Sequence, residues 1–441
     1  MMSVHHDRAA RRGTSREVTT RDAATAAPCT ARPRGTTRPA PVLQLAFPDV
    51  QDDRRGRRAP TVEICAGAFG LGLGILQAGF APGSYYDIDP HACATLRANL
   101  GVWASGVHEG DIRTVAWKTG TGRTDLLAAG TDCRPFSLAG LQAGQHDPRN
   151  LFPELVRALR GMEPLALLSE NVPNLVGRSF RPYFDYVVRQ IADPFLVARV
   201  GEIWWRHDER LKAHAAEPGF RPLYDVRWRV VNAADYGVPQ YRKRVIVVAT
   251  RADAGIAPYQ FPAATHAKAA LLRAQADGSY WTQHGLAPRP PVAPAPAFDD
   301  GLLAWRTVRD ALAGLPAPSP TEAGAWMNHW VLREARRYPG HMGSRLDEPS
   351  LTIKAGAHGV AGGENMYLDD LGTPRHYTLR ECARLQGFPD THIFVGRQTH
   401  VMHQIGNAVP VGLARSIASP LYDLLGGSRG AHMAPRAAAM R

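Results

Sequence analysis

Apolar and polar positions follow a regular pattern from residue 61 onward. Six short, mainly apolar runs have the length of β-strands: 61–65, 84–88, 125–129, 165–169, 229–232 and 245–250. Four segments have the apolar spacing that is typical of helices: 73–78, 90–100, 378–388 and 411–425. Because strands and helices alternate, the pattern predicts an α/β fold with a doubly wound, mostly parallel sheet.

The pattern weakens after residue 253, in a stretch to 349 that is dense in Ala and Pro. We interpret residues 253–376 as a smaller, loop-rich domain inserted into the larger one. The other predicted parts are a disordered basic tail at 1–58, the larger domain at 59–252, C-terminal segments that return to it at 377–425, and a flexible tail at 426–441.

Length and charge narrow the class of protein only modestly. A chain of 441 residues suits one larger and one smaller domain, and its net charge of +12 favours a nucleic-acid partner. Half of that charge lies in residues 1–58, where twelve Arg face six acidic residues (12 − 6 = +6), so charge alone does not identify a DNA-binding enzyme. The five cysteines lack metal-ligand spacing, and we expect no metal site, no disulfide frame and no membrane span.

Glycines and carboxylates follow the first two predicted runs and a further short strand, the third in chain order, which ends at Gly110-Asp111-Ile112. Four glycines come directly after the first strand: Gly67, Gly70, Gly72 and Gly74. They allow a tight turn and close approach to a ligand, but their spacing does not match the G-x-G-x-x-G of dinucleotide sites. Asp87 or Asp89 could bind ribose hydroxyls, and Asp111 could meet an adenine amino group. Each feature alone has a structural interpretation, but their order favours a nucleoside cofactor.

Cys133 follows a glycine turn at the end of the run 125–129. This position presents a thiol at the rim where α/β sheets bind ligands. A thiolate that attacks carbon 6 of cytosine makes carbon 5 electron-rich enough to accept a methyl group. The alternative is a buried structural cysteine, which is the usual role of a lone Cys.

A carboxylate and two arginines suit the same chemistry. Glu170 comes just past a predicted buried strand, where its acid could protonate ring nitrogen 3 and relieve the negative charge built by the attack. Arg242 and Arg244 project on one side of an extended segment, and their forked donors suit a base carbonyl oxygen and a phosphate. A structural carboxylate and a solvated basic edge are the alternatives.

In this order, the segments resemble the DNA cytosine-5 methyltransferases of the bacterial and phage type. The resemblance covers residues 61–418 without most of 253–349. Six segments carry it: Glu63–Gly70, Gly130–Ser137 with 151–154 after it, Glu170–Val172, Gln240–Arg244, Thr378–Asp390 and Gln404–Pro410. It implies the Rossmann-like fold of S-adenosylmethionine-dependent methyltransferases, in which a methyl group passes to a flipped-out cytosine held in a covalent cysteine adduct.

The resemblance also implies residue roles. Cys133 would be the nucleophile, Glu170 the acid at ring nitrogen 3, and Arg244 the donor to the base carbonyl oxygen. Arg242 would hold the cysteine loop or a phosphate. S-adenosylmethionine would contact Cys65, Gly67, Gly70, Asp87, Asp111, Ile112, Leu151, Asn407 and Val409. DNA contacts would come from Ser137, Gln240 and Thr352, the last in a segment, 346–353, that enters the DNA near the target base. Residues 59–252 would form the catalytic and cofactor-binding domain, and 253–376 the target-recognition domain.

The chain departs from the family pattern beside the nucleophile. The family has Pro-Pro before the cysteine and Gln after it, whereas this chain has Thr131, Asp132 and Arg134. The charge of Asp132 should raise the pKa of the thiol, and a salt bridge to Arg134 could offset this effect. Cys65 stands where an aromatic residue packs on the cofactor, and Phe69 where glycine is usual.

Two other functions fit part of this pattern. One is a DNA-binding paralogue with impaired catalysis, suggested by Thr131 and Asp132; the other is an RNA cytosine-5 methyltransferase, against which the long 253–349 stretch argues. We expect a cytoplasmic, nucleoid-associated monomer in a bacterial or phage-infected cell, with double-stranded DNA as its partner. A cognate restriction endonuclease of a restriction-modification system would act separately.

Overall fold

A computed structural model describes residues 61–117, 124–137, 143–290, 294, 301–321, 326–331, 335–337, 342–356 and 365–427. Its seven-stranded sheet has the order β3-β2-β1-β4-β5-β7-β6. The strands are β1 (Thr61–Ile64), β2 (Ser84–Asp87), β3 (Val107–Glu109), β4 (Leu126–Gly130), β5 (Ala166–Asn171), β6 (Tyr224–Asn232) and β7 (Lys243–Arg251). The first five pair in parallel, and β7 runs antiparallel to β5 and β6. This confirms the predicted α/β fold and its closing strand pair.

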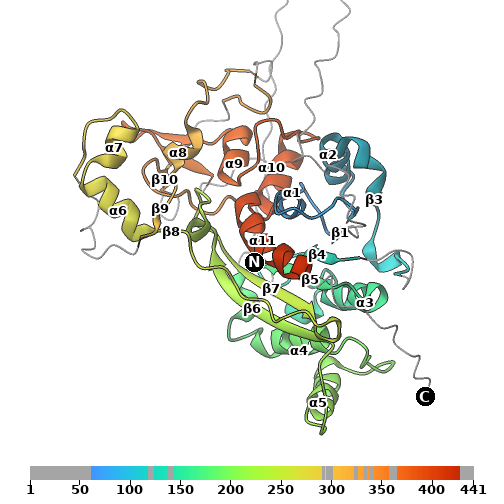
Figure 1. Cartoon of the computed structure of the whole chain (residues 1–441). Coiled ribbons are helices and arrows are strands. Elements are labelled where there is room, and N and C mark those ends of the chain that lie inside the picture. Colours follow the sequence, from blue (N-terminus) through green and yellow to red (C-terminus); the bar gives the residue numbers. More distant parts are fainter. Residues whose placement is uncertain are drawn as a thin grey trace, which may run out of the picture. The chain divides into compact units, whose positions relative to one another are not determined.

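Helices cover both faces of the sheet. Alternate residues of β4 face opposite sides, as the pleat of a strand requires. On one face, Leu126 packs with α1 (Gly70–Gln77) and α11 (Val411–Gly427). On the other, Leu127 packs with α3 (Phe152–Met162) and α4 (Arg181–Ala192). Figure 1 shows α1 and α11 together, with α3 and α4 lying below them. Burial on both faces fixes the strands and therefore the positions of their ends.

The C-terminal segments return to the start of the domain, as predicted. Helices α9 (Leu379–Leu385) and α10 (Gln398–Asn407) pack with α2 (Pro90–Leu100) in one apolar cluster. Thr95 of α2 donates to Gln404 of α10 across 2.6 Å. Helix α9 begins with a capping box between Thr378 and Glu381, which satisfies two otherwise unpaired backbone N–H groups. The predicted C-terminal tail overlaps the last two residues of α11 and otherwise lies outside the described residues, as does the tail at 1–58.

The described residues of the 253–376 region form only short elements. These are β8 (His266–Ala267), α6 (Lys268–Ala276), α7 (Ser279–Gln283), β9 (Leu303–Ala304), α8 (Val308–Leu312), β10 (Ser344–Arg345), β11 (Met366–Leu368) and β12 (Pro374–His376). They give one two-stranded and one three-stranded sheet. A further helix, α5 (Trp204–Ala215), follows α4 in the larger part of the chain.

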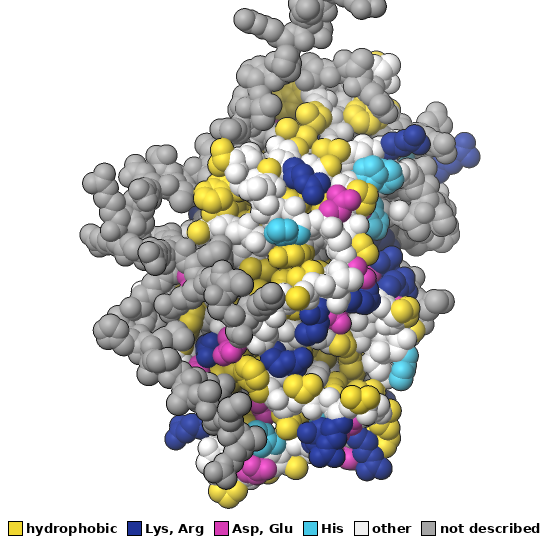
Figure 2. All heavy atoms as spheres, turned by 90° about the vertical axis from the view of Figure 1, so that its right-hand side faces the viewer, with side chains coloured by type: hydrophobic (Ala, Val, Ile, Leu, Met, Phe, Trp, Pro, Cys, Tyr) yellow, Lys and Arg dark blue, Asp and Glu magenta, His cyan; other side chains and the backbone are white. Residues whose placement is uncertain are grey.

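The described surface carries charges of both signs. On the face shown in Figure 2, Lys and Arg side chains lie interspersed with acidic and hydrophobic ones. Within the described part of the chain, no helix combines the length and apolar character needed to cross a bilayer. The same residues contain no cluster of His, Cys, Asp and Glu suited to a metal ion.

Candidate active site

Strand pairing brings Glu170 and Arg244 together next to the cysteine loop, residues 131–137. Gly130, the last residue of β4, pairs with Glu170 of β5, and Glu170 pairs with Ile246 of β7. Arg244 lies two residues before Ile246 and therefore on the same face, diagonal to Glu170. Its Nε is 2.6 Å from Oε1 of Glu170. Cys133 follows Gly130 by three residues, so its loop starts where this ion pair lies.

The Glu170–Arg244 pair is largely removed from water. The side chains are 9% and 12% exposed, respectively. Removing one partner of such a buried pair typically costs about 3–5 kcal/mol, because the other charge is left uncompensated. The pair therefore holds both side chains in a defined geometry before any substrate arrives.

Cys133 is half-buried, and its pKa is raised above the ordinary thiol value. Burial is the largest cause, followed by the nearby Glu170 carboxylate, and Arg244 partly opposes them. The Asp132 carboxylate raises the pKa further, in the predicted direction. The free protein therefore holds a thiol that must lose its proton as it reacts.

Two asparagines anchor the cysteine loop. Asn171 Nδ2 donates to the carbonyl and the hydroxyl of Thr131, at 3.1 and 3.0 Å. Asn174 Nδ2 donates to the Phe136 carbonyl at 2.8 Å, and the Phe136 ring is fully buried. The loop is thus fixed on both sides of Cys133. Thr131, which replaces a family proline, contributes a hydroxyl acceptor that proline lacks. The sequence analysis missed Asn174 and Phe136, and only the proximity of Asn174 to the Glu-Asn-Val signature could have indicated its role.

Asp132 and Arg134 form the salt bridge anticipated from the sequence. Arg134 Nε lies 2.9 and 2.8 Å from the two carboxylate oxygens of Asp132. The Arg134 side chain is 59% exposed, so this bridge is weakly stabilising. Its effect is to place a compensating charge beside the carboxylate that faces the thiol.

Two expectations for the Gln240–Arg244 segment are corrected. The Gln240 side chain is fully buried and bonds Leu385 O, Gln386 Oε1 and the Ile353 N–H, so a DNA contact is not supported. Arg242 is also buried; rather than holding the cysteine loop or a phosphate, it donates to backbone carbonyls. The acceptors are Ile353 O at 3.0 Å, Gly406 O at 2.8 Å and Ala408 O at 3.0 Å. Both side chains join the larger domain to segments more than 100 residues later.

The glycine turn and Asp87 form a cradle at the ends of β1 and β2. The Gly67 N–H donates to Asp87 Oδ2 at 2.8 Å, and the Asp89 N–H donates to Oδ1 at 2.8 Å. Asp89 itself caps α2 by accepting from the His91 N–H. Gly67 has a φ of +55°, and the position of a Cβ there would meet no described atom within 4 Å. This open, backbone-lined space with a carboxylate beside it fits the ribose end of a nucleoside.

Only some of the other residues expected to contact the cofactor lie next to this cradle. A Cβ on Gly70 would lie 2.3 Å from Val409 O, so Gly70 allows the Gln404–Pro410 segment to pack on the turn. The remaining five belong to different environments. Ile112 is buried in the apolar cluster against which Cys65 and Leu151 pack. Asn407 is exposed at the end of α10 and contacts His403.

The Asp111 carboxylate, expected to bind adenine, is already in contact with Arg113. Its carboxylate accepts from the Arg113 N–H at 2.9 Å and pairs with the Arg113 side chain at 3.0 Å. These contacts, the backbone hydrogen bond first, lower the pKa of Asp111. An adenine amino group would therefore have to share this carboxylate with Arg113.

Glu63, which belongs to the motif Glu63–Gly70 but had no predicted role, lies against the glycine turn: a Cβ on Gly72 would be 2.2 Å from its Oε2. Its side chain is buried, and burial raises the pKa of this carboxyl to about 8, although a hydrogen bond from the Gly72 backbone partly opposes the shift. A polar residue in an otherwise apolar strand is the sequence signal that could have identified it. The cradle thus contains a titratable group near neutral pH.

The two remaining expected DNA contacts lie at the edges of the site. Ser137 is half-buried at the end of the described cysteine loop. Thr352 is half-buried, and its hydroxyl donates to Tyr241 O at 2.6 Å. Thr352 therefore lies beside the segment that leads into Arg244.

Comparisons with known proteins identify the family of the chain. A family model for C-5 cytosine-specific DNA methylases matches residues 60–193, 215–282 and 325–423. The type II methyltransferase M.NgoMIV of Neisseria gonorrhoeae is 30% identical over 376 residues, covering 83% of this chain and 97% of the relative. M.Eco47II of Escherichia coli, also a type II methyltransferase, is 31% identical over 370 residues, 82% of this chain and 79% of its own length.

The fold also matches solved structures. The structure of a methyltransferase from Entamoeba histolytica, EhMeth, superposes with a TM-score of 0.50 at 12% identity, over 83% of this chain and 99% of that one. At this identity the likeness concerns the fold alone. The sequence match carries the assignment: the chain belongs to the C-5 cytosine-specific DNA methylase family.

Proposed function

We propose that this chain transfers a methyl group from S-adenosylmethionine to carbon 5 of a flipped-out cytosine in DNA. The observation that carries the proposal is the placement of Cys133 beside the buried Glu170–Arg244 pair. A nucleophile, an acid and a forked cationic donor are the three groups needed by a base that is attacked at carbon 6.

The chain's own residues would act in sequence. The Cys133 thiol loses its proton and its sulfur forms a bond to carbon 6, which pushes electrons toward ring nitrogen 3 and carbon 5. Glu170 would hold a proton at nitrogen 3, and Arg244 would donate to the neighbouring carbonyl oxygen. Because these two side chains contact each other in the free protein, the entering base must replace part of that contact. After methylation, nitrogen 3 would return its proton to Glu170 and solvent water would take the proton from carbon 5. The electron pair of that carbon–hydrogen bond forms the carbon 5–carbon 6 double bond and expels the Cys133 sulfur as a thiolate.

Residues at the cradle would hold the methyl donor. Asp87 offers a carboxylate, and Gly67 leaves space beside it for a nucleoside, with the Val409 backbone packed against Gly70 of the same turn. S-adenosylmethionine supplies an electrophilic methyl group when bound. Asp87 would accept from its ribose, and the Ile112 side chain would contact its base.

The substrate class follows from the family and its type II relatives, which makes double-stranded DNA the proposed partner. We infer that residues 253–376 form the target-recognition domain and that Thr352 contacts DNA near the flipped base. A restriction endonuclease that recognises the same site is the proposed functional counterpart.

Incubation with tritiated S-adenosylmethionine and mixed-sequence duplex DNA tests the proposal. We expect label in DNA as 5-methylcytosine, and none with Cys133→Ser. Salt-sensitive DNA binding without any label would instead identify a paralogue with impaired catalysis. Faster labelling of RNA than of duplex DNA would overturn the choice of substrate.

A further inference from the structure

Residues 346–353, here called the Thr352 segment, are anchored at both ends. At the C-terminal end, the Tyr241 N–H donates to Ser350 O at 2.7 Å, and the Thr352 hydroxyl donates to Tyr241 O at 2.6 Å. The Ile353 N–H donates to Gln240 at 3.0 Å. This end is therefore fixed to residues 240–241, just before β7, the strand that presents Arg244 to Glu170.

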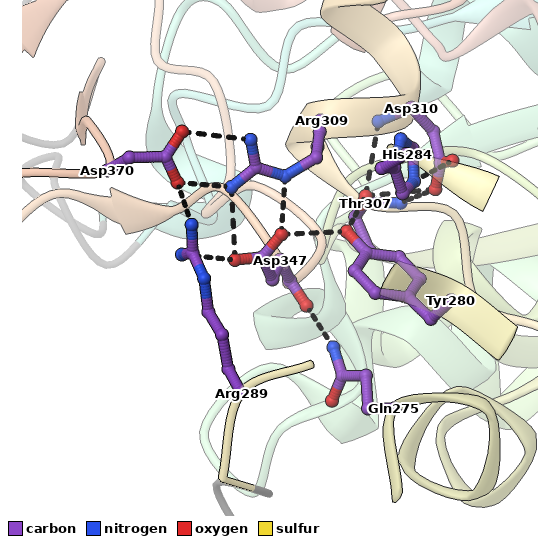
Figure 3. Close-up of polar contacts among 9 residues, drawn as sticks. All are labelled: Gln275, Tyr280, His284, Arg289, Thr307, Arg309, Asp310, Asp347 and Asp370. Carbon is purple, nitrogen blue, oxygen red and sulfur yellow. Dashed lines mark hydrogen bonds and ion pairs between the residues drawn. The ribbon is translucent and has the colours of Figure 1, made fainter. Parts of the chain in front are cut away.

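At the N-terminal end, Asp347 is the centre of a network of polar contacts (Figure 3). Arg309 of α8 bonds both carboxylate oxygens, with Nε at 2.6 Å and Nη2 at 3.2 Å. The Tyr280 hydroxyl donates to the same carboxylate at 2.9 Å, and Arg289 Nη1 lies 3.5 Å away. The Asp347 carbonyl accepts from Gln275 at 2.7 Å. Four side chains of the 253–376 region thus converge on one residue of the Thr352 segment.

Asp370 contacts the same two arginines as Asp347 but lies outside the Thr352 segment. Its carboxylate accepts from Arg309 at 2.6 Å and from Arg289 at 2.8 Å. Arg309 is the main reason why the pKa of Asp370 falls to about 2. Asp370 lies in the turn after β11, outside residues 346–353. It therefore provides a control that perturbs the same cations while leaving the carboxylate of the Thr352 segment in place.

The two arginines lie outside the parts of the chain that match the family model. Arg289 and Arg309 lie between residues 283 and 324, a stretch that the family model does not match. Asp347 lies in the matched part. The network consequently joins an unmatched segment to the shared catalytic framework.

We propose that Asp347, held by Arg309 and Arg289, is a positioning residue that fixes the Thr352 segment between the recognition region and the Glu170–Arg244 pair. This inference rests on the proposed function. A guanidinium fork fixes both the distance and the orientation of a carboxylate. Loss of that restraint would let Thr352 shift relative to the flipped base, and a displacement of about 1 Å can slow a reaction by about 100-fold.

The test compares Asp347→Asn with Asp370→Asn on a plasmid whose methylated cytosines are mapped by sequencing. For Asp347→Asn we expect a single-turnover rate about 10- to 100-fold lower, more methylation outside the wild-type sites, and an unchanged KM for S-adenosylmethionine. Asp370→Asn should change the rate less than about threefold. Equal effects of the two variants would mean that the network only stabilises the fold, and would overturn the proposal.

A readout independent of activity separates this inference from the proposed reaction. Hydrogen exchange of the free protein should be faster at the Ser350, Leu351 and Ile353 amides in Asp347→Asn, and unchanged there in Asp370→Asn. If Asp347→Asn does not fold, Arg309→Lys keeps the charge but loses the fork, and the same local exchange is expected. If the wild-type protein methylates no DNA, the proposed function is wrong. If hydrogen exchange is unchanged in both Asp347→Asn and Arg309→Lys, the proposed positioning role of Asp347 is wrong.

Discussion

The sheet that presents Glu170 and Arg244 and the 253–376 region differ in the length of their strands and in the polar contacts between their segments, although apolar clusters occur in both. Strands β6 and β7 pair over nine residues each, and the sheet is covered by apolar clusters on both faces. In the 253–376 region, no strand of the described residues exceeds three residues, and a network of ion pairs links its segments. Salt does not screen apolar burial, whereas it screens partly exposed ion pairs. We therefore expect salt to weaken contacts within the 253–376 region more than the packing of the sheet.

The largest effect should come from the reaction centre. Glu170→Gln preserves the shape of the side chain but can neither form the ion pair with Arg244 nor take up and pass on a proton at ring nitrogen 3, so we expect methyl transfer to fall about 10²- to 10⁴-fold. Glu163→Gln is the matched control, because Glu163 pairs with Arg251 at the opposite end of the same strands, at 3.0 Å. Radioactive methyl-transfer assays measure both. If Glu163→Gln lowers the rate of methyl transfer as much as Glu170→Gln does, the effect of Glu170 is not specific to the active site.

The second effect concerns stability beneath the cradle. The folded-state pKa of Glu63 is raised to about 8 from an ordinary value near 4.5, so the folded protein retains this proton more strongly than the unfolded chain. The stability contributed by protonated Glu63 is fully present below pH 4.5, the ordinary pKa of the group. It falls by roughly 1.4 kcal/mol for each pH unit between 4.5 and the folded-state pKa of about 8. Glu63→Gln should therefore flatten the dependence on pH. Urea denaturation between pH 5 and pH 9 measures it, and identical slopes for variant and wild type would contradict the account.

A smaller effect is expected at the cysteine loop. Because burial and the Glu170 carboxylate raise the pKa of Cys133, the single-turnover rate should keep rising as the pH increases above neutrality. Asp132→Asn removes one charge that raises this pKa, so the rise should begin at lower pH. Single-turnover rates measured at several pH values test this, with Asp185→Asn as a control distant in sequence. A profile that is the same in both variants and in wild type would show that Asp132 does not act on the thiol.

The smallest effect should come from the exposed side of the ion-pair network. The Asp370 side chain is 43% exposed, so Asp370→Asn should lower the free energy of unfolding by no more than about 1 kcal/mol, and by less at high salt. Chemical denaturation at low and high sodium chloride measures this change. If Asp370→Asn lowers the free energy of unfolding by several kcal/mol even at high salt, screened ion pairs do not distinguish the 253–376 region from the sheet.

The same comparison explains what the sequence could predict. Buried strands have a local signature, so the sheet, its closing pair and the Cys133 loop were predictable from short runs of residues. Gln240 and Arg242 looked like surface groups for DNA because their partners lie far along the chain, at Leu385 and Gly406 among others. Nor could the sequence reveal that Arg309 and Asp347 meet. The placement of a polar side chain depends on tertiary partners, and no local pattern encodes them.

Covalent trapping tests the central claim most directly. Duplex DNA containing 5-fluorocytosine at the sites methylated by the wild type is incubated with the protein and S-adenosylmethionine, because fluorine at carbon 5 blocks the final elimination. We predict a denaturation-resistant complex in which mass spectrometry locates the base on the Cys133 peptide, absent from Cys133→Ser. Methylation of ordinary DNA without any such adduct, or an adduct on another residue, would contradict the account.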